Sequence, residues 1–489
     1  MSRPRTGDNR ALSARAQAAA AAWEDAALLP TLRAAAAAAP DDPERWQLLG
    51  LAQRNLDEHG DALASFRQAI RLAPDDALLA HALARTALEA GLPAVALFER
   101  TLKLAPLDAS VMLGLAAAQL AAGDPSAAIA GLRRQLRRYP DWYDGHASLA
   151  RLSWQAGHRD TVGASFEEAL RSRPRDGLLW REYAMTMLGT GAPDHTRAVV
   201  ARARAALGRS RVLDLIEAAS SSEAGDLAAA DALFASGPTV DDAFLAHYVR
   251  HLLRAGRADR AAELLEGRLD GEGGRELLPL AALAWRAVGD PRWRPLADAR
   301  AVRVFDLEDR LPDLAALADR LRALHRTAHH PLDQSPRGGT QTDGPLFARL
   351  DPELRALRSL ILDTVRTYLN ALAAPPDATA ANKPIRFAGS WSVRLTGGGH
   401  HVDHVHPAGW ISSAFYVVVP DGAERDPDRS GWLTLGDAPS LDQTFAPIAE
   451  VAPRPGRLVL FPSTMWHRTR PFSAGERLSV AFDIARPPR

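Results

Sequence analysis

Prolines recur at an almost constant interval through the first part of this chain. They stand at Pro40, Pro74, Pro106, Pro140 and Pro174, which are 34, 32, 34 and 34 residues apart. Each proline follows a stretch with the apolar period of an α-helix. A period of this length is typical of stacked helix pairs, because one pair cannot bury its apolar face alone. The period therefore predicts an all-α solenoid with a concave surface.

The clearest copy of the repeat runs from residue 43 to residue 74. Small and large apolar residues take fixed places in it, namely Trp46, Leu49, Gly50, Ala62, Phe66, Ala69 and Pro74. This pattern resembles the tetratricopeptide repeat. The repeats are clear over residues 40–174, and a weaker helical pattern continues after them. We therefore expect residues 1–299 to form a tetratricopeptide-repeat α-solenoid, with degenerate repeats after residue 174.

The pattern changes near residue 300. Residues 314–326 and 352–373 keep a helical period, but short β-type runs separated by Gly, Pro and Asp then take over, at residues 385–396, 410–419, 431–435, 457–461 and 477–484. Short strands with long connections favour a double-stranded β-helix, or jelly roll, flanked by helices. The chain is thus predicted to be a multidomain α + β protein in which residues 300–489 form the second domain.

The composition restricts the chemistry that the chain can support. There is no cysteine among the 489 residues, which excludes disulfides, thiolate zinc sites and iron–sulfur clusters. The 59 basic and 59 acidic residues balance, so charge gives no argument for nucleic acid or an anionic membrane. No apolar run is long enough to span a bilayer and no signal segment begins the chain. We therefore expect a cytoplasmic protein that binds neither nucleic acid nor membrane.

Histidines concentrate in one short segment and recur once more near the C-terminus. His401 and Asp403 form one i, i+2 pair, His404 and His406 form a second, and His467 stands alone. A strand directs residues i and i+2 to the same side, and a mononuclear ferrous site needs three protein ligands on one face of an octahedron. The two pairs have opposite strand phase, so one regular strand cannot present both. The spacing leaves open which pair would join His467.

A second signal follows His467 by ten residues. Arg477 and Ser479 lie beyond a turn-like segment, and both would point to one side of a strand. A guanidinium with a hydroxyl beside it holds a carboxylate by charge-assisted hydrogen bonds. The far carboxylate of 2-oxoglutarate requires a holder of this kind.

Residues 389–483 resemble the 2-oxoglutarate/iron(II) dioxygenase superfamily. More narrowly, they resemble bacterial oxygenases in which tetratricopeptide repeats precede the oxygenase domain. The residues that carry the resemblance are GSWSVRL (389–395), HVDHVHPAGWISS (401–413), FYVVVP (415–420), GRLVLFP (456–462), His467 and Arg477-Leu-Ser479, with QSPRGGTQT (334–342) upstream.

The resemblance implies Fe(II), O₂ and the cosubstrate 2-oxoglutarate. The recurrent core of the narrower family is His-x-His-Pro, which matches His404 and His406. The resemblance therefore favours His404, His406 and His467 as iron ligands over a set that uses His401 and Asp403.

The resemblance also assigns roles to residues around the metal. Arg477 and Ser479 would hold the C5 carboxylate of 2-oxoglutarate. Further candidates for the pocket lining lie on or beside the core strands, namely Trp391, Arg394, Trp410 and Tyr416. A loop that covers the pocket is expected to carry Gln334, Arg337 and Thr340. Trp410 and Tyr416 also suit plain core packing.

Three functions fit these observations. The first is a hydroxylase that oxidises a C–H bond of a protein or peptide, which the concave face of the repeats presents. The second is a hydroxylase of a small or carrier-bound molecule, in which the repeats serve assembly. The third is a repeat scaffold whose oxygenase fold is catalytically inactive.

Overall fold

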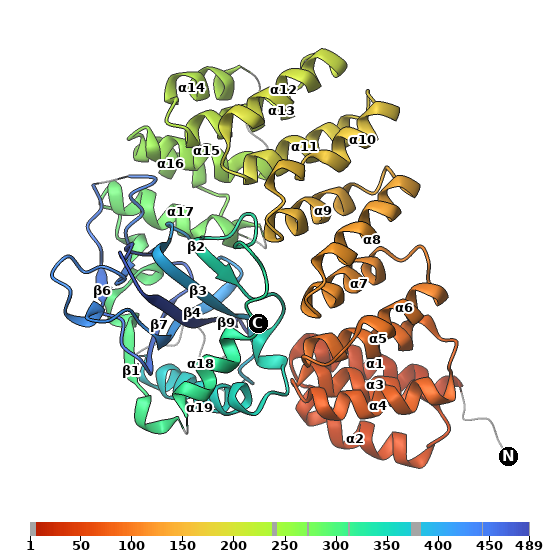
Figure 1. The fold of residues 1–489 in the computed structure, drawn as a ribbon. Helices are drawn as coiled ribbons and strands as arrows, with labels where there is room; N and C mark the ends of the chain where they lie inside the picture. The colour runs from red at the N-terminus through yellow and green to blue at the C-terminus, as the bar shows by residue number, and fades with distance from the viewer. Residues whose placement is uncertain are drawn as a thin grey trace.

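The first part of the molecule is a continuous series of antiparallel helix pairs. The computed structural model describes residues 6–236, 242–270, 273–311, 313–372, 383–442 and 444–488. Figure 1 shows the helical part as an arc. Its helices are α1 (Thr6–Ala22), α2 (Asp25–Ala38), α3 (Pro43–Asn55), α4 (His59–Leu72), α5 (Ala77–Glu89), α6 (Val95–Leu104), α7 (Ala109–Ala121), α8 (Pro125–Arg138), α9 (Tyr143–Gln155), α10 (Ala164–Ser172), α11 (Gly177–Gly189), α12 (Pro193–Leu207), α13 (Arg211–Glu223), α14 (Leu227–Ala235), α15 (Asp242–Arg254), α16 (Ala258–Leu265) and α17 (Gly274–Ala287).

An aspartate two residues after a repeat proline starts the next helix pair. The carboxylates of Asp42, Asp76, Asp108 and Asp176 accept hydrogen bonds from backbone N–H groups in the first turns of α3, α5, α7 and α11. Such N-caps satisfy N–H groups that have no partner inside the helix. The proline ends one helix and the aspartate begins the next, which explains the period seen in the sequence.

Glycine allows consecutive helices to approach closely, both within a pair and between neighbouring pairs. A Cβ atom added to Gly50 would lie 2.8 Å from the ring of Phe66, and one added to Gly114 would lie 2.2 Å from the ring of Phe98. Both rings are fully buried. The small and large positions of the repeat are therefore complementary across the helix contact.

The second part of the molecule contains two antiparallel sheets. In the described residues, the large sheet has the order β1-β7-β4-β9-β3-β2 and the small sheet the order β6-β5-β8. The strands are β1 (Arg303–Asp306), β2 (Pro336–Gln341), β3 (Phe387–His401), β4 (Gly409–Val418), β5 (Leu433–Leu435), β6 (Ala449–Val451), β7 (Arg457–Pro462), β8 (His467–Thr469) and β9 (Glu476–Ala485). This is the jelly-roll architecture expected from the sequence, and the predicted fold class is confirmed.

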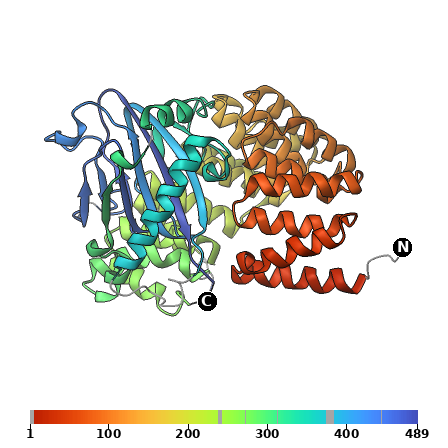
Figure 2. The same cartoon turned by 90° about the horizontal axis from the view of Figure 1, so that it is seen from below.

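The two faces of the large sheet pack against different partners. One face forms an apolar core with α18 (Leu314–Arg322) and α19 (Pro352–Ala371), and Figure 2 shows α19 lying across it. On the other face, Tyr416, Val459 and Phe461 pack against Leu433 and Leu435 of the small sheet. Along β9, Leu478, Val480 and Phe482 belong to the helix-covered core, so Arg477, Ser479 and Asp483 point to the side of the small sheet.

The arc of helices passes around the sheet domain and contacts it at many points (Figure 1). Hydrogen bonds join the two parts through the pairs Arg386–Asp25, Leu350–Ala90, Arg326–Ala121, Ala328–Gln155, Arg254–Ser440 and Trp466–Pro279. The sheet domain is therefore held on the inner side of the arc along most of its length. We propose a domain boundary near residue 300, between α17 and β1. Among the described helices, none combines the length and the apolar character that a bilayer crossing demands.

Candidate metal and cosubstrate site

Three histidines from two segments meet between the sheets. His404 and His406 lie in the irregular segment after β3, and His467 begins β8. Backbone hydrogen bonds of 3.0 Å run in both directions between His404 and His467 and join the two segments. The ligand atoms that the three rings offer lie within 4.8 Å of one another. The local backbone pairing therefore brings together residues that are 63 positions apart in the sequence.

The Nδ1 atom of each ring has its own partner. His404 Nδ1 lies 2.8 Å from the carbonyl oxygen of Val402, and His467 Nδ1 lies 3.1 Å from that of Met465. His406 Nδ1 lies 2.9 Å from a carboxylate oxygen of Asp483. An Nδ1–H that donates to such an oxygen leaves Nε2 with a free lone pair. The arrangement therefore offers three Nε2 atoms to a shared centre.

Burial keeps two of these rings neutral. It lowers the pKa of His404 to about 3, and the neighbouring His406 acts in the same direction. Burial, followed by His404 and His406, holds the pKa of His467 well below its usual range. Neutral imidazoles are good ligands for first-row transition metals, including iron, so the donor set fits Fe(II).

Asp483 is a residue of the site that the sequence reasoning missed. Its second carboxylate oxygen accepts a hydrogen bond of 2.6 Å from Ser412 Oγ, so both oxygens of this carboxylate have partners. The negative charge of this carboxylate therefore lies directly behind His406. A signal was present in the sequence, because Asp483 has the same strand phase as Arg477 and Ser479 in an otherwise apolar run.

The alternative pair is not brought together with His467. His401 lies beside His404, with ring centroids 5.6 Å apart, and its Nδ1 is 2.9 Å from Ser335 Oγ. Asp403 accepts a hydrogen bond of 2.7 Å from the backbone N–H of Ser440. The carboxylate of Asp403 is therefore engaged with the neighbouring loop that contains Ser440.

Arg477 is a buried cation with few partners. Its side chain is on β9, the residue is 2 % exposed, and the guanidinium lies over the ring of Tyr416 at 5.0 Å from the centroid. Within the described residues, Arg477 Nε, Arg477 Nη1 and the hydroxyl of Tyr416 have no hydrogen-bond partner. A buried charge without a counterion is costly, so this arrangement fits an anionic ligand.

The pair formed by Arg477 and Tyr416 lies close to the three clustered histidines. The Tyr416 ring under the guanidinium belongs to the same buried cluster as Phe461, and the Phe461 ring lies 4.8 Å from that of His467. Ser479 is two residues beyond Arg477 on the same side of β9 and is also buried. A dicarboxylic acid held at Arg477 could therefore extend toward the three imidazoles.

Four residues on the core strands were expected to line the pocket. Two of them lie beside the three histidines and Arg477, and two do not. The ring of Trp391 stacks on that of His406, with centroids 5.4 Å apart and planes 14° apart, and Tyr416 lies under Arg477. Trp410 instead packs in the core between the large sheet and its helices. Arg394 projects to the helix side of the sheet, where it binds Glu476 at 2.6 Å.

The expected covering loop is partly a strand. Residues 336–341 form β2, which pairs with β3 at the edge of the large sheet. The guanidinium of Arg337 binds the carbonyl oxygens of Gln334 and Pro336, and the Thr340 hydroxyl lies 2.8 Å from His325. The interpretation as a plain loop was therefore wrong for residues 336–341, because pairing with β3 orders a sequence of loop-like composition.

Comparison with known proteins agrees with this geometry. Residues 389–483 match the family model described as "Putative 2OG-Fe(II) oxygenase", and residues 93–152 match the tetratricopeptide repeat model. The chain contains a 2OG-Fe(II) oxygenase domain and tetratricopeptide repeats. The oxygenase family implies Fe(II) and 2-oxoglutarate, and the matched segment includes all three clustered histidines, Arg477 and Asp483.

Other comparisons give weaker likenesses. No curated protein matches the chain. Among solved structures, a prolyl-4-hydroxylase of Pseudomonas putida is 18 % identical, with a TM-score of 0.26 over 38 % of this chain and 93 % of that chain. A tetratricopeptide repeat protein from Parabacteroides merdae is 16 % identical, with a TM-score of 0.30 over 56 % of this chain and 98 % of that one. These scores are too low to support an argument about function.

Proposed function

We propose that this chain is an Fe(II)- and 2-oxoglutarate-dependent hydroxylase of a protein or peptide. The observation that carries the proposal is the group of three clustered imidazoles together with the buried guanidinium of Arg477, whose Nε and Nη1 have no hydrogen-bond partner within the described residues. When bound, Fe(II) and 2-oxoglutarate supply the oxidation of a substrate C–H bond by O₂, with succinate and CO₂ as the coproducts.

In this proposal the three histidines hold the metal and Asp483 orients one of them. His404 and His467 are fixed by backbone carbonyls, while His406 is fixed by the carboxylate of Asp483. The carboxylate also places a negative charge next to a site whose three proposed ligands are imidazoles. Trp391 stacks on the flat side of His406 and limits the positions that this ring can take.

Arg477 and Ser479 hold the C5 carboxylate of 2-oxoglutarate. A guanidinium donates charge-assisted hydrogen bonds to a carboxylate, and Nε and Nη1 of Arg477 have no other partner among the described residues. The Tyr416 hydroxyl, which is also without a partner among the described residues, is a third donor. These contacts would fix the orientation of the cosubstrate relative to the metal.

The solenoid supports a polypeptide substrate. Its later helices approach the metal segment, since Trp466 next to His467 donates to the carbonyl oxygen of Pro279 and lies 5.6 Å from the guanidinium of Arg250 on α15. The metal segment therefore packs directly against the last helices of the solenoid, so a polypeptide bound to these helices would come near the site. The inactive-scaffold hypothesis is disfavoured, because a buried arginine with two nitrogens that lack partners among the described residues is costly to retain without a ligand.

Cosubstrate turnover tests this proposal. Purified protein with Fe(II), 2-oxoglutarate and O₂ is expected to form succinate, and a cell extract is expected to stimulate the reaction. Ultrafiltration then separates the substrate classes: the retained macromolecules should stimulate succinate formation and gain one oxygen atom by mass. Stimulation by the small-molecule filtrate alone would contradict the polypeptide substrate. A folded, iron-loaded protein that forms no succinate under any of these conditions would contradict the hydroxylase proposal.

Replacing Asp483 with asparagine is expected to weaken Fe(II) binding roughly 10- to 100-fold, as loss of a ligand's hydrogen-bond partner usually does. The amide can keep a hydrogen bond to His406, but it removes the negative charge. Calorimetric titration with Fe(II) under anaerobic conditions measures the change. Asp403→Asn is the matched control, because that carboxylate binds Ser440 instead of a clustered histidine, and its affinity should remain within about threefold of the original.

A further inference from the structure

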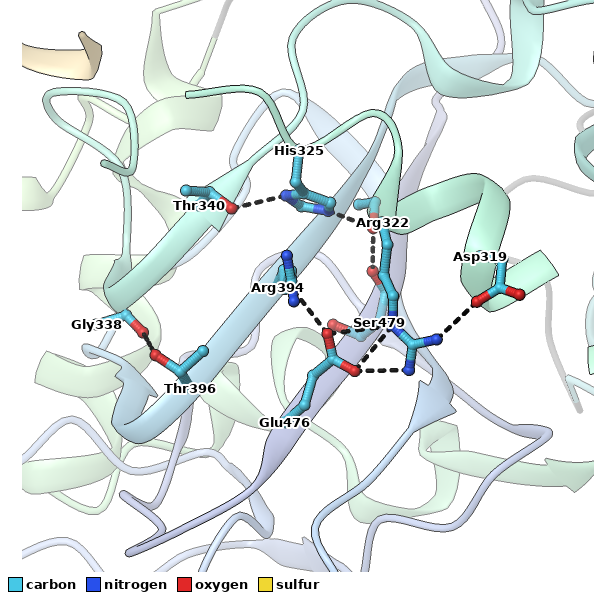
Figure 3. Close-up of polar contacts among 10 residues, drawn as sticks. Asp319, Arg322, His325, Gly338, Thr340, Arg394, Thr396, Glu476 and Ser479 are labelled. Atoms are coloured by element: carbon cyan, nitrogen blue, oxygen red, sulfur yellow. Dashed lines mark hydrogen bonds and ion pairs between the residues drawn. The ribbon is translucent and has the colours of Figure 1, made fainter. Parts of the chain in front are cut away.

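We infer that His325 and Glu476 are positioning residues that hold β9 in the place where Arg477 and Ser479 can bind the cosubstrate carboxylate. Both act from the helix side of the large sheet, opposite the three histidines. The inference rests on the proposed function of Arg477 and Ser479. Figure 3 shows the polar network that carries it.

A directed chain of hydrogen bonds ends at the backbone of Ser479. The Ser392 hydroxyl donates to the carbonyl oxygen of Ser479 at 3.0 Å, and the same oxygen of Ser392 lies 3.0 Å from His325 Nε2. Because the single hydroxyl proton is used on Ser479, His325 Nε2–H must be the donor to Ser392. His325 Nδ1 then accepts from the hydroxyl of Thr340 at 2.8 Å.

The charge state of His325 suits this chain. Burial, with Arg394 acting in the same direction, lowers the pKa of His325 to about 4. The imidazole is therefore neutral near pH 7, with one donor and one acceptor nitrogen. This series of hydrogen bonds connects the loop after α18 with strands β2, β3 and β9. Each donor in it has an acceptor.

A second contact holds the other end of the same segment. The carboxylate of Glu476 accepts hydrogen bonds from Arg322 at 2.7 and 3.0 Å and from Arg394 at 2.6 Å. Burial alone would raise the pKa of Glu476, but the hydrogen bonds from the two arginines outweigh it and lower the pKa. The ionised carboxylate thus ties β9 to α18 and to β3.

These contacts fix the β9 backbone on both sides of Arg477. Glu476 immediately precedes Arg477, and Ser479 is the residue whose carbonyl is held. The backbone is therefore fixed on both sides of Arg477, while the side chains of Arg477 and Ser479 project to the opposite face. A bidentate carboxylate contact tolerates only a small error in position. Fixing this short backbone segment would preorganise the cosubstrate site.

The test compares His325→Leu, which removes both nitrogens, with His325→Gln, which retains one acceptor and one donor. His325→Leu is expected to raise the Kd for 2-oxoglutarate about tenfold, with Fe(II) affinity unchanged, and His325→Gln should restore most of the loss. Ser392→Ala should have a similar effect. The double variant His325→Leu/Ser392→Ala should cost about as much as the larger single change, because both act through one chain.

Thr396→Val is the matched control. The Thr396 hydroxyl donates to the carbonyl oxygen of Gly338 at 3.2 Å and so links β2 to β3. Thr396 lies opposite Glu476 in the sheet, but its hydroxyl is not part of the hydrogen bonds that join His325, Ser392 and Ser479. The 2-oxoglutarate affinity of this variant should not change. If His325→Leu does not fold, Thr340→Val removes the hydroxyl donor to Nδ1 with little change in shape, and a severalfold rise in the same Kd is expected.

Three results separate the possible failures. A lower Tm for His325→Leu with an unchanged Kd for 2-oxoglutarate would mean that the hydrogen bonds through His325 have a purely structural role, and it would overturn the inference. Equal losses in His325→Leu and His325→Gln would also overturn it, because the retained donor and acceptor would then be irrelevant. A wild-type protein that binds Fe(II) but not 2-oxoglutarate would instead overturn the proposed function, and the inference with it.

Discussion

Replacing His467 with glutamine is expected to reduce Fe(II) affinity and succinate formation by at least about 100-fold. Losing a metal ligand costs more than losing a ligand's hydrogen-bond partner, which typically costs roughly 10- to 100-fold. The residue is buried and its backbone pairs with that of His404, and glutamine keeps similar volume at this position. Anaerobic calorimetry with Fe(II) and a succinate assay in air measure the two effects separately.

His400→Gln is the matched control for this change. His400 belongs to the same histidine-rich segment, but its Nδ1 faces the carbonyl oxygen of Gly398 and it is outside the clustered group. Both measurements should match the wild type within about twofold, since surface substitutions away from a site change little. Equal losses in the two variants would show that the segment is merely sensitive to substitution, and normal Fe(II) binding by His467→Gln would remove this residue from the metal site.

Replacing Arg477 with methionine is expected to change function and stability in opposite directions. Affinity for 2-oxoglutarate should fall about 100-fold or more, because charge-assisted hydrogen bonds to a buried carboxylate are each worth roughly 1.5–3 kcal/mol. In the absence of the cosubstrate, the free energy of unfolding should rise by about 1–3 kcal/mol, because an unpaired buried charge is replaced by an apolar side chain. Binding titrations and urea unfolding measure the two quantities.

Arg457→Met is the control for these opposite effects on binding and stability. Arg457 is also on a strand of the large sheet, but its guanidinium binds Asp306 at 2.7 and 3.0 Å. That variant should retain its 2-oxoglutarate affinity and gain no stability. If Arg477→Met bound the cosubstrate normally, the assignment of its carboxylate to Arg477 would be wrong. A large loss of stability in the same variant would mean that the guanidinium has partners when no ligand is bound.

The repeats could be predicted from the sequence because their signals are local. A proline, an N-capping aspartate and a helical apolar period lie within a few residues of one another, and the structure uses each of them. Strands β4, β7 and β9 were also predictable, since each is a largely apolar run whose residues are mostly buried on both faces. Their order in the sheet depends on distant pairings, which no local pattern contains.

Other strands could not be recognised because their neighbours create them. Strand β2 has the composition of a turn, with two adjacent glycines, and it is ordered by pairing with β3. Strands β6 and β8 have only three residues each, which is too short for a period to be seen. The β8 pairing matters most for the site, because it places His467 opposite His404.

The candidate site was only partly visible in the sequence. Residue spacing alone left two overlapping ligand pairs, and the family resemblance separated them. Strand phase could not do so, because the segment that holds His404 and His406 is irregular. The grouping of Arg394 with Trp391 was wrong, because residues three positions apart on a regular strand project to opposite faces.

Anaerobic titration of the metal-free protein with Fe(II) and 2-oxoglutarate tests the central claim most directly. Chelation of iron by the cosubstrate produces a weak charge-transfer band in the visible spectrum. We predict that the band requires both additions in the wild type, is absent in His467→Gln and needs far more 2-oxoglutarate in Arg477→Met. A correctly folded wild-type protein that binds Fe(II) but shows no band at saturating 2-oxoglutarate would contradict the account.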